Sequence, residues 1–346
     1  MSIPTISIDS PLERLFVEKA RENPSNFPSR NKDYVAAYKT IKEHLATKYY
    51  QVAGTGLAAG GHRFTRHDIT HVDDVIDVAG RIMGLDQKGS ETTDITAYET
   101  FVLLMAILVH DAGNAYERKG HEVKAARILL DIGDASPLSN IERRLVASIA
   151  SAHGGKTADG SRDTIDDRIR QDPVEIDGHV VNGRRLADLV RLADEFSERG
   201  RRADDIAIET KQPPQAYLPN FFCRSINVRI DPSSRSASMD FDLDKSDLLD
   251  HHCDPENDDK LTLIVDYIAK RLNKADLERR YCNRYLAGWH SIDVFRSTIT
   301  VYEDDIQVGE PTKAILSDTG YPSVARKLAF EGSEIKKKYC GDHDAD

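Results

Sequence analysis

The sequence predicts a mainly α-helical protein, in which a helical bundle is followed by a C-terminal extension that mixes helices and strands. Apolar residues recur at helical spacing through most of residues 1–200. Beyond the segment KQPPQ, near residue 213, two stretches alternate between apolar and polar residues, which is typical of strands. The chain of 346 residues is 40 % hydrophobic and 30 % charged, so it is long and apolar enough to bury a sizeable core.

We expect three parts: an N-terminal helical segment over residues 1–60 that packs on the core, a helical domain over 61–212, and an α+β region over 213–346. The first part shows two helical patterns separated by the loop NPSNFPSRN, and it ends in the glycine-rich stretch AGTGLAAGG. The backbone amides of this stretch could approach a phosphate. Because it lacks the Lys-Ser/Thr ending of a P-loop, an ordinary flexible loop is the favoured interpretation.

The helical domain is expected to contain five helices. Their apolar positions place them at residues 66–83, 98–109, from about 120 onward, 140–152 and 183–198. The second of them, over residues 98–109, is apolar on nearly all sides and is therefore predicted to be a buried central helix. A polar stretch over residues 154–182 precedes the last helix.

The C-terminal region is expected to begin with a β-hairpin. Alternating residues over 226–230 and 237–243 flank the turn DPSSRS, and a long helix over 259–285, a strand over 292–302 and a final helix over 322–339 follow. The adjacent residues His251, His252 and Cys253 contain potential metal ligands. With no partner motif, they are interpreted as part of a loop.

Several classes of protein are excluded or disfavoured by composition. The longest apolar run, residues 101–109, is much shorter than the roughly 20 residues of a membrane span. We expect no signal peptide, and the four widely spaced cysteines indicate reduced thiols, so a cytoplasmic location is predicted. The net charge of −11 disfavours a protein that coats nucleic acid, although a local basic groove stays open.

Histidines and aspartates fall on the core-facing sides of the predicted helices of the central domain. His71 lies four residues before Val75, and His110 with Asp111 ends the buried helix. Three more residues share a helical face with apolar neighbours, namely His121, His153 and Asp194. A single buried histidine is usually a satisfied core residue. Because buried charges must be paired or bound to metal, six such residues together favour a metal site.

These residues resemble the motif of the HD-domain superfamily, whose members are mostly metal-dependent phosphohydrolases and phosphodiesterases with an all-helical core. The resemblance lies in the order H…HD…D, in the setting LLMAILVHDAGN and in the downstream segment LVRLADEFSE, and it covers about residues 62–200. It implies an HD-type bundle in which His71, His110, Asp111 and Asp194 hold one metal ion. GHEVKAARIL and ASIASAHGGK resemble the additional segments of two-metal members, which implicates His121 and His153. Asn114 stands where many two-metal relatives have lysine, and no GYP motif follows His153.

The resemblance implies hydrolysis of a phosphoester or phosphodiester, in a nucleotide or cyclic nucleotide, by metal-activated hydroxide. Imidazole and carboxylate ligands suit Mn, Fe, Zn, Ni or Co, as one or two ions. Asp111 follows a ligand at a helix end and is therefore expected to bridge the ions and to be catalytic. Three other activities stay open: a diiron oxygenase, a metal-dependent nuclease and a non-catalytic nucleotide sensor. We also leave a homo-oligomer open.

Further residues near the motif are candidates for substrate contacts. His67 lies four residues before His71 and is predicted to act in catalysis, as a further ligand or a phosphate contact, with a supporting or surface role as the alternative. Basic side chains that flank the ligand segments are expected to bind the negative charge of the substrate, namely Arg63, Arg66, Arg118, Lys124 and Lys156.

Overall fold

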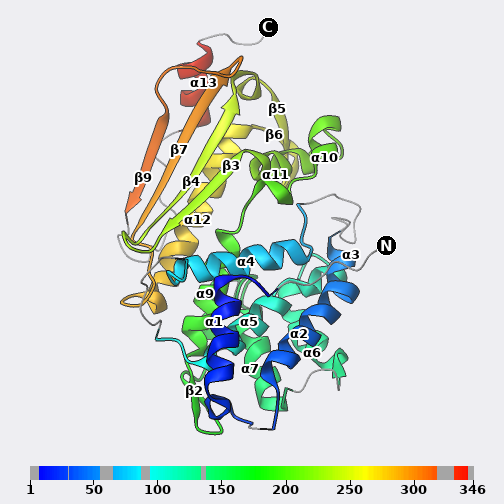
Figure 1. Ribbon diagram of the computed structural model, residues 1–346. Helices are drawn as coiled ribbons and strands as arrows, with labels where there is room; N and C mark the ends of the chain where they lie inside the picture. The colour runs from blue at the N-terminus through cyan, green and yellow to red at the C-terminus, as the bar shows by residue number, and fades with distance from the viewer. Residues whose placement is uncertain are drawn as a thin grey trace. The chain divides into compact units, whose positions relative to one another are not determined.

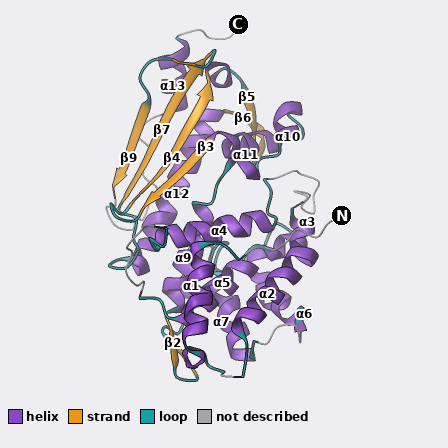
Figure 2. Ribbon diagram, in the orientation of Figure 1, coloured by secondary structure: helices purple, strands orange, loops and turns teal. Residues whose placement is uncertain are grey.

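The computed structural model describes residues 8–29, 31–54, 65–86, 94–133, 138–317 and 331–341. The chain divides into two compact units, residues 1–61 with 67–194 and residues 62–66 with 195–346. The described part of the first unit is a helical bundle, and the second unit combines helices with a mixed sheet (Figure 1, Figure 2). The predicted fold class, mainly α with an α+β extension, is therefore confirmed.

The bundle is built around one apolar helix, α5 (Ala97–Val109), in which every residue is buried. This confirms the predicted central helix. The other α-helices of the unit are α1 (Pro11–Glu22), α2 (Tyr34–Leu45), α3 (Gln51–Ala53), α4 (Ile69–Ile82), α6 (Ala125–Asp131), α7 (Asn140–Ser151), α8 (Thr164–Arg168) and α9 (Gly183–Glu195). Helices α1, α2, α4 and α7 pack against α5. Thr96 and Glu99 form a capping box that begins α5.

A buried lysine fixes α4 against the two N-terminal helices. Lys42 Nζ lies 2.8 Å from Glu13 Oε1 and 2.8 Å from Asp73 Oδ1, and its side chain is only 1 % exposed. Two carboxylates from different helices therefore neutralise the one buried ammonium group, as a buried charge requires. Since Asp73 lies in α4, the same helix as His71, this ion-pair cluster helps to set the position of His71.

Helix α4 begins later than the predicted residue 66. Asp68 is its N-cap, and the Asp68 side chain accepts a hydrogen bond from the backbone N–H of Thr70. His67 therefore precedes the helix, whereas the predicted helix over residues 66–83 included it, and that part of the prediction was wrong. The rings of His67 and His71 are nevertheless close, with centroids 5.3 Å apart.

The predicted polar stretch contains structure that the sequence pattern did not predict. It includes α8 and a short antiparallel hairpin formed by β1 (Val174–Ile176) and β2 (His179–Val181). The pattern is weak because each strand is only three residues long and has a single buried residue.

The second unit contains the predicted β-hairpin within a larger sheet. Strands β3 (Ile226–Asp231) and β4 (Ser236–Asp244) pair in antiparallel fashion, and β4 pairs in parallel with β7 (Val294–Glu303). Strands β8 (Ile306–Gln307) and β9 (Thr312–Ser317) both pair with β7. Alternate residues of β4 and β7 are buried, including Phe241 and Phe295. The two parallel strands need a long crossover, and this crossover contains a second hairpin and a helix.

The crossover corrects two predictions. His251, His252 and Cys253 are not in a loop but in strand β5 (His251–Asp254), which pairs with β6 (Asn257–Leu263). Consequently the long helix, α12 (Ile264–Leu286), begins five residues later than predicted. His252 stacks on Tyr217 with ring centroids 4.0 Å apart, and the metal-binding groups found among the described residues do not include these three residues.

The remaining helices of the second unit are α10 (Asp205–Thr210), α11 (Pro214–Ser225) and α13 (Gly332–Cys340). The predicted final helix began at residue 322, but residues 318–330 lie outside the described part of the chain. The same holds for most of the glycine-rich stretch, since residues 55–64 are not described. In the described ranges we find no helix with the length and apolar character that crossing a membrane requires.

Candidate metal centre

Two groups of side chains in the first unit could each hold a metal ion, and they share Asp111. The first ligand set consists of His71, His110, Asp111 and Asp194. The second ligand set consists of Asp111, His121 and His153. All six predicted metal ligands therefore converge, although they come from segments that are more than 120 residues apart in the chain.

The first ligand set is compact and mostly buried. His71 Nε2 lies 3.3 Å from Asp111 Oδ2 and 3.2 Å from Asp194 Oδ1, and His110 Nε2 lies 3.7 Å from each of the same two oxygens. Atoms that bind one ion at about 2.1 Å lie roughly 3.0 to 3.5 Å from one another. His71 and His110 are fully buried, whereas 29 % of the Asp194 side chain is exposed.

The second ligand set uses the other oxygen of Asp111. His121 Nε2 lies 3.0 Å from Asp111 Oδ1, and His153 Nε2 lies 3.7 Å from it. The ring centroids of His121 and His153 are 5.4 Å apart. The Asp111 carboxylate thus faces His71 and His110 with Oδ2 and the other two histidines with Oδ1, which is the arrangement expected of a bridging ligand.

Hydrogen bonds to the backbone orient three of the histidine rings. His110 Nδ1 donates to the carbonyl of Ile107 at 2.7 Å, His121 Nδ1 to Arg118 at 2.8 Å and His153 Nδ1 to Ala150 at 2.6 Å. A hydrogen on Nδ1 leaves the lone pair on Nε2, the atom that points at the aspartates. His110 Nε2 is buried and makes no hydrogen bond with any described residue. A buried ring nitrogen without such a partner suits a metal ligand once it has lost its proton, so the residues present fit a metal ion.

Four of the candidate ligands lie at or just beyond the ends of helical segments, whereas His71 lies in the first turn of α4 and Asp194 in the last turn of α9. His110 is the C-cap of α5, Asp111 follows it, His121 begins the 3₁₀ turn η4 (His121–Lys124), and His153 follows α7. The end of α5 is itself held by Tyr50, whose hydroxyl donates to the carbonyl of Leu108 at 2.7 Å. Helix ends allow side chains from several elements to meet at one point.

The charges of the cluster shift the pKa values in opposite directions. Burial would lower the pKa of His110, but the carboxylates of Asp111 and Asp194 raise it to about 9. Burial and the neighbouring His110 lower the pKa of His153 to about 3. The nearby histidines outweigh burial and hold the pKa values of the Asp111 and Asp194 carboxyls well below their usual range. In the metal-free chain at pH 7, His110 therefore carries the positive charge that partly balances two carboxylates.

We expect metal uptake to release a proton and to weaken at low pH. His110 must lose its proton to bind a cation, and its pKa of about 9 lies above neutral pH. Affinity for the ion should therefore rise by about tenfold for each pH unit between pH 6 and 8. Calorimetry in two buffers of different ionisation enthalpy measures the protons released at pH 7. Metal binding with no proton release would contradict a protonated His110 that becomes a metal ligand.

The predicted substrate-binding residues differ in where the structure places them. Arg118 Nη1 lies 3.0 Å from His67 Nε2 and 3.2 Å from Asn114 Oδ1, and His67 Nε2 lies 3.8 Å from Asp111 Oδ2. Arg118 and His67 therefore lie at the edge of the cluster. Because Arg118 donates to His67 Nε2, that atom is occupied as an acceptor and is poorly suited to bind metal in this arrangement.

The other predicted cations are not brought to the cluster by any contact that we observe. Lys124 Nζ pairs with Glu117 at 2.7 Å, and Lys156 is exposed after His153. Arg66 belongs to the second unit, and Arg63 lies outside the described residues.

Sequence reasoning missed two residues beside the ligands. Tyr50 supports the end of α5, and no sequence signal identifies it. Glu122 is buried and directly follows His121, and this place in the sequence is the signal that could have identified it.

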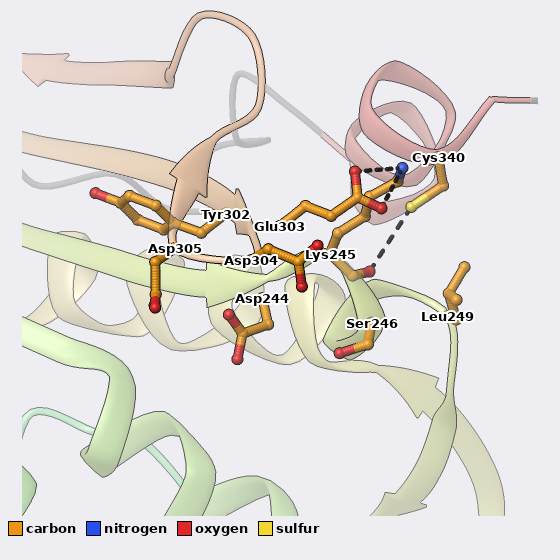
Figure 3. A pocket seen from close by; sticks show the side chains of 9 residues that line it. All are labelled: Asp244, Lys245, Ser246, Leu249, Tyr302, Glu303, Asp304, Asp305 and Cys340. Atoms are coloured by element: carbon orange, nitrogen blue, oxygen red, sulfur yellow. Dashed lines mark hydrogen bonds and ion pairs between the residues drawn. The ribbon is translucent and has the colours of Figure 1, made fainter.

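A separate pocket of about 680 Å³ in the second unit has a different character. Four carboxylates line it, from Asp244, Glu303, Asp304 and Asp305, together with Lys245 and Cys340 (Figure 3). Lys245 Nζ pairs with both carboxylate oxygens of Glu303 at 3.0 Å. The remaining negative charge disfavours a phosphorylated ligand here, and the lining includes none of the predicted site residues.

Comparison with known proteins agrees with the geometry. The family model HD-CE, of the HD type, matches residues 61–292, which is well over half of the chain and includes both ligand sets. Searches of curated proteins and of solved structures found no match. The match confirms the resemblance to the HD superfamily that the histidine and aspartate pattern predicted. The chain therefore belongs to the HD-CE family.

Proposed function

We propose that this chain is a metal-dependent phosphohydrolase or phosphodiesterase that acts on a phosphorylated small molecule, a nucleotide or cyclic nucleotide being the favoured class. The observation that carries the proposal is the position of Asp111, whose two oxygens face two different groups of histidines. Such a carboxylate can hold two cations side by side, and paired cations stabilise both the attacking and the leaving oxygen of a phosphoryl transfer.

Each residue of the centre has a role in this proposal. When bound, divalent ions supply Lewis acidity toward the phosphoryl oxygens and lower the pKa of water to roughly 7. Asp111 holds both ligand sets together, and the hydrogen bonds from Nδ1 of His110, His121 and His153 keep their Nε2 atoms aimed inward. Asp194, with 29 % of its side chain exposed, lies on the side that solvent reaches. We assign Arg118, beside His67, to binding a phosphoryl oxygen.

Replacing Arg118 by Ala is expected to raise KM for a phosphoester by about tenfold, because one charge-assisted hydrogen bond to the substrate is lost. kcat should change much less, since the metal ligands stay in place. Steady-state kinetics of the metal-loaded chain measures both constants. Arg127→Ala is the matched control, because the Arg127 side chain is 72 % exposed and pairs with Asp131. An unchanged KM in Arg118→Ala would contradict the assignment.

The proposed activity is tested directly with the full chain. The protein is stripped with a chelator, reloaded separately with Mn, Fe, Zn, Ni or Co, and assayed with bis(4-nitrophenyl) phosphate, nucleotides, cyclic nucleotides, and single-stranded DNA and RNA. We expect hydrolysis of a small phosphoester with at least one metal, and none in His110→Ala. His251→Ala, which removes an exposed histidine of β5, should behave as the unaltered chain.

Two outcomes would overturn the proposal. The first is the absence of metal-dependent hydrolysis with every metal and substrate. The second is oxygen consumption by the iron-loaded chain without hydrolysis, which would favour the diiron oxygenase, because the set of four histidines and two aspartates also suits iron.

A further inference from the structure

Glu122 is a buried carboxylate that directly follows a candidate metal ligand. The residue is 9 % exposed, and its side chain contacts groups on three segments. Glu122 Oε2 lies 3.5 Å from Nδ1 of His121, the ring atom that also donates to the carbonyl of Arg118. A carboxylate is buried at a large cost in free energy unless neighbouring groups compensate its charge. The position of Glu122 therefore requires an explanation.

The second contact of Glu122 is with the turn that follows His153. Gly155 has a φ of +78°, which favours glycine, and a Cβ built there would lie 2.2 Å from Glu122 Oε1. The carboxylate thus occupies the space that the missing side chain leaves. Through His121 on one side and Gly155 on the other, Glu122 joins the two histidine segments of the second ligand set.

The third contact compensates the charge. Arg168 Nη2, at the end of α8, lies 4.0 Å from Glu122 Oε1, and the Arg168 side chain is 13 % exposed. Arg168 Nη1 is buried and makes no hydrogen bond with any described residue. Helix α8 is itself tied to the end of α7, since Thr164 Oγ1 donates to the carbonyl of Ala152 at 2.8 Å. Arg168 is therefore held next to the segment that carries His153.

We propose that Glu122 is a positioning residue for the metal ion of the second ligand set. It fixes the distance between the segments of His121 and His153, and its negative charge beside Nδ1 makes the His121 imidazole a stronger ligand at Nε2. The inference rests on the proposed function in one respect, which is that the centre binds two ions. It assigns Glu122 no contact with substrate.

Metal titration of the full chain tests this role. The chelator-treated protein is titrated with Co²⁺ and followed by calorimetry and by visible absorption, which reports the coordination of each ion. We expect Glu122→Gln to bind its first equivalent as the unaltered chain does and its second equivalent at least tenfold more weakly. Glu18→Gln makes the same chemical change at an exposed position of α1 and should leave both affinities unchanged.

A second pair of variants tests the link to Gly155. In the otherwise unaltered chain, Gly155→Ala should weaken the binding of the second Co²⁺, because the new methyl group displaces the Glu122 carboxylate. It should add little further weakening in Glu122→Ala, where that carboxylate is absent. If Gly155→Ala weakened the binding of the second Co²⁺ equally with and without the Glu122 carboxylate, Gly155 and Glu122 would not act together, and this part of the proposal would be overturned.

The possible failures are distinguishable. If the unaltered chain binds no Co²⁺, the proposed function itself fails. If it binds two equivalents and Glu122→Gln is indistinguishable from it, only the positioning role is overturned. Equal loss of both ions in Glu122→Gln would also overturn that role, because it would show a general effect on the fold.

Discussion

Replacing Asp111 by Asn should reduce metal-dependent hydrolysis by at least about a thousandfold, which corresponds to roughly 4 kcal/mol of transition-state stabilisation. The reason is that Asp111 alone belongs to both ligand sets. Its Oδ2 lies 3.3 Å from His71 Nε2 and its Oδ1 lies 3.0 Å from His121 Nε2. An amide keeps the size of the side chain but removes the negative charge, and its nitrogen cannot act as a ligand.

The Asn variant should also bind fewer ions than the unaltered chain. Elemental analysis and steady-state assays on the same preparation measure the two effects together, and circular dichroism shows whether the bundle has folded. Asp131→Asn, at the end of α6, is the control, since the Asp131 side chain is 39 % exposed and lies outside both sets. A folded Asp111→Asn variant with full metal content and an unchanged rate would exclude Asp111 as the bridging residue.

Replacing Gly113 by Ala is expected to destroy the second ligand set. Gly113 lies two residues after Asp111, and a Cβ built on it would lie 2.2 Å from the carbonyl oxygen of His121 and 3.0 Å from its Cα. All the nearest atoms belong to the His121 backbone, so no side-chain rotation relieves the overlap. The segment of His121 must move, which withdraws its Nε2 from Asp111.

We expect this overlap to lower the free energy of unfolding by about 2 kcal/mol, as overpacking of a buried site does. The second ion should be lost while the first is retained, because His71, His110 and Asp194 lie elsewhere. Thermal unfolding and metal titration measure the two effects. Gly154→Ala is the matched control: Gly154 follows His153, and a Cβ there meets nothing within 4 Å. If Gly113→Ala bound both ions with unchanged affinity, the close packing of Gly113 against the backbone of His121 would have no role in the site.

The sequence predicted the bundle and the convergence of its candidate ligands because both depend on spacing along the chain. The apolar run of α5 is buried on every side, and such a run is recognisable without any tertiary information. The doublet His110-Asp111 at its end and the apolar residues beside His153 and Asp194 placed these side chains toward the core. Spacing was misleading for His67, because the cap at Asp68 separates it from α4.

Features that depend on contacts between distant residues could not be predicted in the same way. Nothing in the sequence shows that Gly113 meets His121 or that Glu122 fills the space beside Gly155.

The strand β5 was missed because His251, His252 and Cys253 do not alternate clearly between apolar and polar, and pairing with β6 stabilises it. Pairing with the next strand in the chain thus outweighs the weak local preference of these three residues.

The number of metal ions that the unaltered chain retains is the most direct test of a metal centre built around Asp111. The purified full chain is incubated in turn with Mn, Fe, Zn, Ni and Co, freed of excess metal, and measured by elemental analysis beside His110→Ala. The two ligand sets around Asp111 predict two ions per chain with at least one of these metals, and a lower content in His110→Ala. A chain that retains none of them, or a His110→Ala variant with the same content as the unaltered chain, would contradict a metal centre built on these residues.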